Sequence, residues 1–154
     1  MITKEKIQEL VATIIDTKKQ FLVNIIVRPG NNIVVVVDDY NGISLEDCVD
    51  ISRKIEADLD RDKEDFELEV TSPGLTQPFI VIQQYYKNLN KDIEVLLKSG
   101  IKLVAKLVSV DEKGIAVEAE KRIKVGDSKK KELILEKQFI VFENIKNTKI
   151  LLPF

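Results

Sequence analysis

The chain has 154 residues with no histidine, a single cysteine and a formal net charge of −2, a length that suits one domain or two small ones. The missing histidine removes the commonest general base and metal ligand, a lone cysteine excludes an internal disulfide, and the sequence has no GxSxG, P-loop or GxGxxG motif. With no run of about 18 apolar residues for a membrane span and no apolar leader at its N-terminus, we expect a cytoplasmic monomer without enzymatic activity, cofactor, metal or small-molecule substrate.

The first 40 residues predict a helix followed by a β-hairpin. A capping threonine and apolar residues at helical spacing mark the helix: Thr3, Ile7, Leu10, Val11 and Ile14. Residues 21–28 and 33–37 are rich in strand-forming residues and are separated by a turn at 29–32. The second strand is a continuous β-branched run, so we expect it to be buried on both faces.

The second helix has the clearest start in the sequence. Ser44 and Asp47 fit a capping box, and Ile43 can pack against Cys48 across the first turn. Cys48 then has a place in the core and is not expected to be a reactive thiol. The predicted buried stripe consists of Leu45, Cys48, Val49, Ser52, Ile55 and Leu59. A strand at 66–71 completes an α-β-β-α-β order, in which both helices can cover one face of a three-stranded sheet.

Residues 66–79 are the most informative segment of the chain. An alternating strand stops abruptly at Ser72, Pro73 and Gly74. Proline fixes its own φ and favours an extended conformation in the residue before it, while Gly74 can take a positive φ. Pro78 restricts the chain again a few residues later. This stiff connector predicts two units held at a set angle.

Beyond the connector, the sequence predicts a short helix at residues 81–89 and then a small β-barrel. Five short strands separated by turn residues fall at 93–97, 101–110, 115–119, 133–141 and 148–152. Five strands in about 60 residues favour closure, because a closed sheet has no exposed edges. The spacing is typical of an SH3-like (Sm-type) barrel. The predicted fold class is therefore α+β, with an α-β-β-α-β two-layer domain at 1–77 and the barrel at 78–154.

The two halves carry opposite charge. Residues 1–77 contain 9 basic and 16 acidic side chains, a net charge of −7, whereas residues 78–154 contain 15 and 10, a net charge of +5. A basic half suits a phosphate backbone and an acidic half suits a basic protein. The change of sign at the connector favours a functional division over two merely solvated surfaces.

The basic charge of the second half is concentrated in one predicted loop, residues 121–131. Its six cations are Lys121, Arg122, Lys124, Lys129, Lys130 and Lys131. Clustered cations without interleaved aromatic residues predict contact with the RNA backbone and no sequence preference. The alternative is a solvated hairpin tip, which is common for long surface loops.

Asp38 and Asp39, at the end of the second strand, are the other candidate site. Consecutive strand residues point to opposite faces, so the two carboxylates are not expected to converge on one metal ion. They either form a turn together with Asn41 and Gly42 or bind arginines and lysines of a protein partner. The sequence alone leaves both interpretations open.

Several segments also resemble the bacterial ribosome maturation factor RimP family. Residues 70–78, Val-Thr-Ser-Pro-Gly-Leu-Thr-Gln-Pro, are similar to the family's inter-domain motif. The other matching segments, in chain order, are residues 37–48, 52–53, 59–60, 142–145 and 151–154. The pattern departs from the family at Gln77, where an arginine is expected, and at Phe79, where an aliphatic residue is usual.

This resemblance implies a non-catalytic assembly factor that binds the immature 30S ribosomal subunit and promotes its maturation. The implied partners are 16S rRNA and the small-subunit ribosomal protein that lines the decoding centre. Partner-binding residues are then expected at Asp38, Asp39, Ser72, Pro73, Gly74, Leu75 and Gln77. One alternative is a general RNA-binding or RNA-chaperone module acting through the barrel. An enzyme using Ser44 or Asp38 ranks last, because no neighbouring motif orients either side chain.

Overall fold

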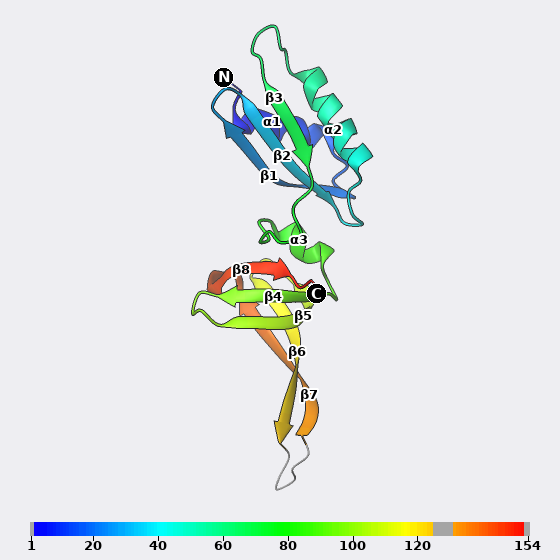
Figure 1. Cartoon of the computed structure of the whole chain (residues 1–154). Helices are drawn as coiled ribbons and strands as arrows, with labels where there is room; N and C mark the ends of the chain where they lie inside the picture. Colours follow the sequence, from blue (N-terminus) through cyan, green and yellow to red (C-terminus); the bar gives the residue numbers. More distant parts are fainter. Residues whose placement is uncertain (1, 125–130, 153–154) are drawn as a thin grey trace. The chain divides into compact units, whose positions relative to one another are not determined.

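The computed structural model describes residues 2–124 and 131–152, with side chains described outside 120–134. The chain divides into two compact units, unit 1 (Met1–Gly74) and unit 2 (Leu75–Phe154), which together make an α+β protein with two sheets (Figure 1). Among the described residues, no helix has the length and apolar character needed to cross a membrane.

Unit 1 has the predicted α-β-β-α-β order. Its elements are α1 (Lys4–Ile14), β1 (Gln20–Arg28), β2 (Asn32–Asp39), α2 (Leu45–Asp58) and β3 (Glu67–Thr71). The sheet has the order β1-β2-β3, with β1 and β2 antiparallel and β2 and β3 parallel. The antiparallel pair is a hairpin whose turn has positive φ at Gly30 and Asn31, two residue types that tolerate this conformation.

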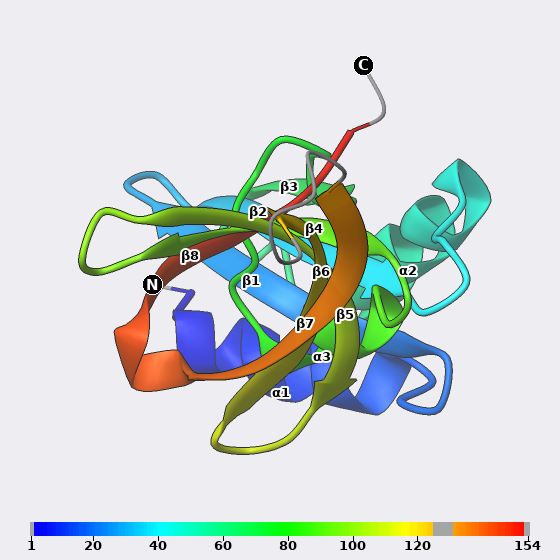
Figure 2. The same ribbon diagram turned by 90° about the horizontal axis from the view of Figure 1, so that it is seen from below.

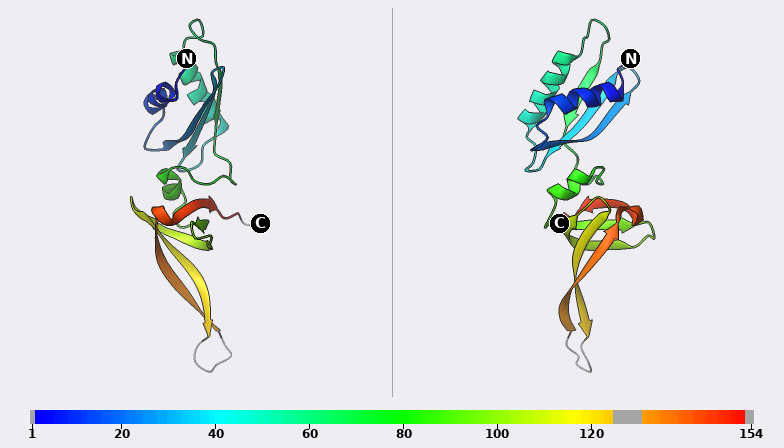
Figure 3. Two further views of the ribbon diagram at one scale, coloured as in Figure 1. Left: turned by 90° about the vertical axis from the view of Figure 1, so that its left-hand side faces the viewer. Right: turned by 180° about the vertical axis from the view of Figure 1, so that it is seen from behind.

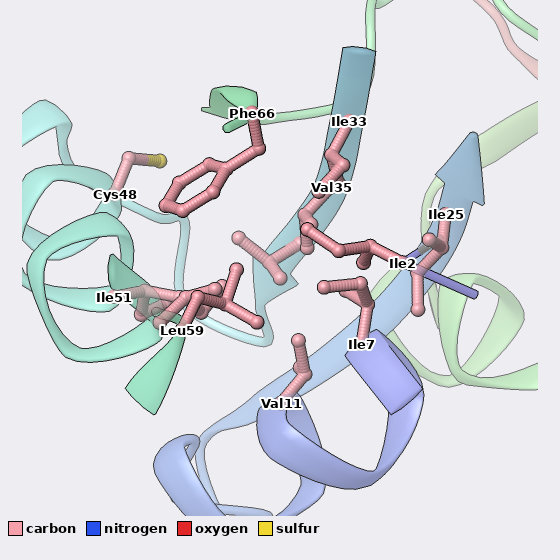
Figure 4. Close-up of a cluster of buried hydrophobic side chains, with 12 residues drawn as sticks. Ile2, Ile7, Val11, Ile25, Ile33, Val35, Cys48, Ile51, Leu59 and Phe66 are labelled. Carbon is pink, nitrogen blue, oxygen red and sulfur yellow. The ribbon is translucent and has the colours of Figure 1, made fainter. Parts of the chain in front are cut away.

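Both helices pack on the same face of this sheet, as the sequence predicts. Ile7 and Val11 of α1 meet Ile51 of α2 over the buried face of β2, to which Val35 contributes (Figure 4). The two helices are seen beside the sheet in Figure 3. The expected burial of β2 on both faces is wrong. Alternate residues of the strand are half-buried, because no helix or strand in the described part of unit 1 forms a second layer over that side.

The helix starts follow local chemistry. The Thr3 hydroxyl accepts a hydrogen bond from the Lys6 backbone N–H at 3.2 Å. At α2 the Ser44 hydroxyl accepts from the Asp47 backbone N–H at 3.0 Å, and the Asp47 carboxylate accepts from the Ser44 N–H at 3.3 Å. The predicted capping box is thereby confirmed, and it satisfies backbone donors that lack partners inside the helix.

The predicted stripe on α2 is only partly right. Cys48 and Ile55 are buried, but Ile51 joins them in the core while Leu45 and Val49 are 86% and 46% exposed. The buried face of α2 is centred on Cys48, Ile51 and Ile55. Leu45 and Val49 lie off this face of the helix. These two aliphatic side chains therefore face solvent.

Unit 2 contains a short helix and one five-stranded sheet. Its elements are α3 (Ile82–Lys87), β4 (Asp92–Leu97), β5 (Lys102–Val110), β6 (Gly114–Lys124), β7 (Lys131–Val141), the 3-10 turn η1 (Phe142–Asn144) and β8 (Ile145–Ile150). Neighbouring strands are antiparallel in the order β7-β6-β5-β4-β8. Figure 2 shows the protein from below. Within the described residues β7 and β8 are the two edges and do not pair with each other. The sheet is open, and the expected closure is not found.

The core of unit 2 lies between the curved sheet and the segment that contains α3. Ile93, Leu107 and Ile115 are fully buried. The Tyr85 hydroxyl donates to Thr148 Oγ1 at 2.7 Å, and Phe79 packs edge-on against the Tyr85 ring. Burial raises the pKa of Tyr85 and the hydrogen bond to Thr148 opposes that rise. The phenol therefore remains protonated at neutral pH.

Candidate partner-binding surfaces

The two aspartates at the end of β2 have different environments. Asp38 pairs with Phe21 of β1 and is 5% exposed, and its Oδ1 accepts from the Asp39 backbone N–H at 2.9 Å. Asp39 is half-buried, and its Oδ1 accepts from the Asn41 N–H at 2.8 Å. The Gly42 N–H then donates to the Asp39 carbonyl at 2.9 Å. Both carboxylates support the turn, and Asp39 is the more accessible of the two.

The parallel pairing of β2 and β3 brings this turn to the start of the connector. Val36 is the register partner of Thr71, so the residues after each strand leave the sheet at the same end, as Figure 1 shows. We call Asp39 to Gly42 together with Ser72 to Gly74 the acidic edge of unit 1. Ser72 and Gly74 are exposed and Pro73 is half-buried.

Two further predicted partner residues belong to unit 2. Leu75 is 63% exposed and Gln77 is exposed as well.

The expected positive φ at Gly74 is not found: the glycines with positive φ are Gly30, Gly42 and Gly100. A connector bounded by two prolines does not need a left-handed residue to turn.

The predicted basic loop is mainly hairpin. The β6–β7 ladder continues to the Lys124–Lys131 pair, so Lys121, Arg122 and Lys124 lie on β6 and Lys131 begins β7. Lys129 and Lys130 lie outside the described residues, as do the other residues between 125 and 130. The structure therefore places four of the six cations on a paired two-stranded segment, which extends from the rest of the sheet in Figure 3.

Among the described residues, no group of three histidine, cysteine, aspartate or glutamate side chains is placed to hold a metal ion. The buried side-chain nitrogen and oxygen atoms in this part of the chain all have hydrogen-bond partners.

Cys48 is a core residue, as predicted. Burial, and then the nearby charges of Asp47 and Asp38, raise the pKa of its thiol above the ordinary value. A raised pKa lowers the thiolate fraction at neutral pH, and thiolate is the reactive form. We expect slow alkylation by iodoacetamide in the folded protein, faster alkylation as the pH rises, and rapid alkylation in urea. Equal rates in folded and urea-unfolded protein at neutral pH would contradict this assignment.

Sequence reasoning missed one surface feature. Leu45 and Val49 have the spacing of core residues, and their exposure depends on which face of α2 the sheet takes. The buried Ile51, two and six residues away, was the available signal. Placing Ile51 at the centre of the apolar face would have turned both side chains outward.

The fold and charge define a two-unit protein with an acidic α+β unit and a β-rich unit that carries most of the basic charge. Residues 10–76 match the RimP N-terminal domain. A relative from Porphyromonas gingivalis, named ribosome maturation factor RimP, is 37% identical over 146 residues, covering 95% of this chain and 96% of the relative. A relative of the same name from Flavobacterium psychrophilum is 31% identical over 100% of both chains. A third, from Christiangramia forsetii, is 35% identical over 94% of this chain and 98% of the relative. The chain belongs to the RimP family of ribosome maturation factors. That family name describes no enzyme class.

Proposed function

We propose that this protein is a non-catalytic assembly factor that binds the immature 30S subunit and promotes its maturation. The observation that carries the proposal is full-length similarity to proteins named ribosome maturation factor RimP. A cytoplasmic location follows from this role. The mechanism is geometric: two surfaces of opposite charge hold a ribosomal protein and rRNA in a relation that favours assembly.

We assign the acidic edge of unit 1 to the protein partner. Residues 1–77 have a net charge of −7, and Asp39 presents a carboxylate at the same end of the sheet as the exposed Ser72 and Gly74. A lysine-rich ribosomal protein near the decoding centre has complementary charge. Asp38, Pro73, Leu75 and Gln77 complete the proposed contact set, with Asp38 acting through the turn.

We assign unit 2 to 16S rRNA. The five-strand order and the helix before β4 support an SH3-like sheet that is bent but open. Its hairpin carries the basic cluster, in which antiparallel pairing holds Lys121, Arg122 and Lys124 on one strand. The paired strands set the order of these cations along the backbone, and contacts to phosphate need no base contacts.

Co-sedimentation with separated 30S, 50S and 70S ribosomal particles tests the function. Selective retention on 30S particles is expected. Binding to protein-free RNA with the same affinity as to 30S would favour a general RNA-binding module. Absence of binding to 30S particles from cells depleted of this factor would overturn the proposal.

Changing Lys129, Lys130 and Lys131 to glutamine is expected to weaken 30S binding and to reduce its salt dependence. Each lost phosphate contact lowers the slope of log affinity against log salt by roughly 0.7–0.9. The matched control changes three cations elsewhere in unit 2, Lys87, Lys91 and Lys113, to glutamine. A slope equal to that of the wild-type protein in the hairpin variant would leave the cluster as a solvated tip.

A further inference from the structure

Two neighbouring aliphatic side chains on α2 face solvent. Leu45 is 86% exposed and Val49, one helical turn later, is 46% exposed. Residues four apart are neighbours on a helix surface, so the pair forms one continuous apolar strip. Both residues lie outside the hydrophobic core cluster of unit 1.

Folding of unit 1 does not require apolar residues at these positions. The start of α2 is fixed by the Ser44–Asp47 capping box, and its buried face is supplied by Cys48, Ile51 and Ile55. Polar residues such as glutamine have a helix propensity close to that of leucine and better than that of valine. The two side chains are therefore available for contact with a partner, and contiguous exposed apolar side chains are a property that contact surfaces share.

The charge around the strip indicates the kind of partner. Glu46 and Asp50 are exposed on the same two turns of α2, each next in sequence to one of the two aliphatic residues, and Arg53 is the exposed cation one turn beyond Val49. The helix also begins shortly after the acidic edge, at the same end of unit 1 (Figure 1). A phosphate backbone would meet repulsion from these carboxylates, and the pair offers no aromatic ring for base stacking.

We propose that Leu45 and Val49 are the apolar anchor by which unit 1 holds a protein segment rich in lysine or arginine that also carries an apolar side chain. The proposal rests on the proposed function and extends the acidic edge onto α2. Glu46, Asp50 and Asp39 form a charged rim, which attracts the basic segment and fixes its orientation. Burial of Leu45 and Val49 supplies the short-range affinity, as in interfaces where a few central side chains dominate binding.

The test compares two double variants for binding to purified 30S particles. Leu45→Gln with Val49→Gln removes the anchor and keeps good helix formers in α2. The control, Ile101→Gln with Val104→Gln, changes two residues of unit 2 that are 57% and 52% exposed. We expect the anchor variant to lose at least tenfold in affinity with unchanged thermal stability, and the control to change less than twofold.

Salt dependence separates this anchor from the basic hairpin. The anchor variant is expected to keep the wild-type slope of log affinity against log salt, because no phosphate contact is lost. A wild-type affinity for the anchor variant would overturn this inference while leaving the proposed function intact. Failure of the wild-type protein to bind 30S particles would instead overturn the proposed function, and the inference with it.

A photo-crosslinking amino acid at position 45 identifies the class of partner. Crosslinks to a basic ribosomal protein are expected in the 30S complex. Crosslinks to rRNA alone would overturn the assignment of this strip to a protein.

Discussion

The Gly114→Ala substitution is expected to lower the free energy of unfolding of unit 2 by about 3 kcal/mol, at the upper end of the usual cost of overpacking. A Cβ at this position would overlap the Ile140 carbonyl oxygen and come within 2.8 Å of Val141 Cα. Gly114 begins β6 opposite Val141 of β7. Because the obstructing atoms are backbone atoms, the two strands must separate to admit the methyl group.

Hydrogen exchange read separately over units 1 and 2 measures this effect. Protection is expected to fall in unit 2 and to remain unchanged in unit 1, which has its own core. Gly100→Ala is the matched control: a Cβ there meets no atom within 4 Å, but the φ of +92° is unfavourable for alanine, at a cost of about 1 kcal/mol. A Gly114 variant no less stable than the Gly100 variant would contradict the close packing of β6 on β7.

The elements of the fold could be predicted where their signals are local. The capping residues Thr3 and Ser44 act on backbone N–H groups within three positions, and the structure has the bonds that the sequence predicts. The strands of the hairpin in unit 1 follow from β-branched runs around Pro29 and Gly30. Such features depend on nearby residues and survive without knowledge of tertiary packing.

The errors concern properties that only tertiary structure decides. Whether β2 is covered on one face or two depends on a second layer, and the described elements of unit 1 provide none over the side that carries Val34 and Val36. Closure of the sheet in unit 2 depends on whether β7 and β8 meet, and this is set by curvature summed over five strands. No pattern within a single strand encodes either property.

The candidate site also combines features that local residues determine with features that only tertiary structure determines. The acidic turn could be located from Asp38, Asp39 and Gly42, since their turn chemistry is local. The placement of that turn at the same end of the sheet as Ser72 depends on the parallel pairing of β2 with β3, which the sequence does not reveal. The length of the β6–β7 hairpin was underestimated, because charged residues suggest a loop even where cross-strand pairing forms a ladder.

The largest difference in the free energy of unfolding is expected between two adjacent substitutions, Asp38→Lys and Asp39→Lys. At 5% exposure, position 38 gives a lysine ammonium little access to water, and an effective penalty of several kcal/mol accompanies burial of such a charge. Asp38→Lys should therefore destabilise unit 1 by about 3 kcal/mol or more. Asp39 is half-buried, so Asp39→Lys should cost only about 1 kcal/mol, mainly through the lost hydrogen bond from the Asn41 N–H.

Asp39→Lys, the variant with the smaller loss of stability, should have a direct effect on binding to 30S particles. If the acidic edge contacts a basic ribosomal protein, Asp39→Lys places like charges together and should reduce 30S affinity at least tenfold in a folded protein. Asp39→Asn is the control, since its amide oxygen can still accept from the Asn41 N–H while the charge is removed, and an intermediate loss is expected. Urea unfolding and 30S co-sedimentation of all three variants give the comparison. Wild-type 30S affinity for a stable Asp39→Lys variant would limit Asp39 to its role in the turn. The protein contact of unit 1 would then have to lie elsewhere, since Asp38 is too buried to meet a partner directly.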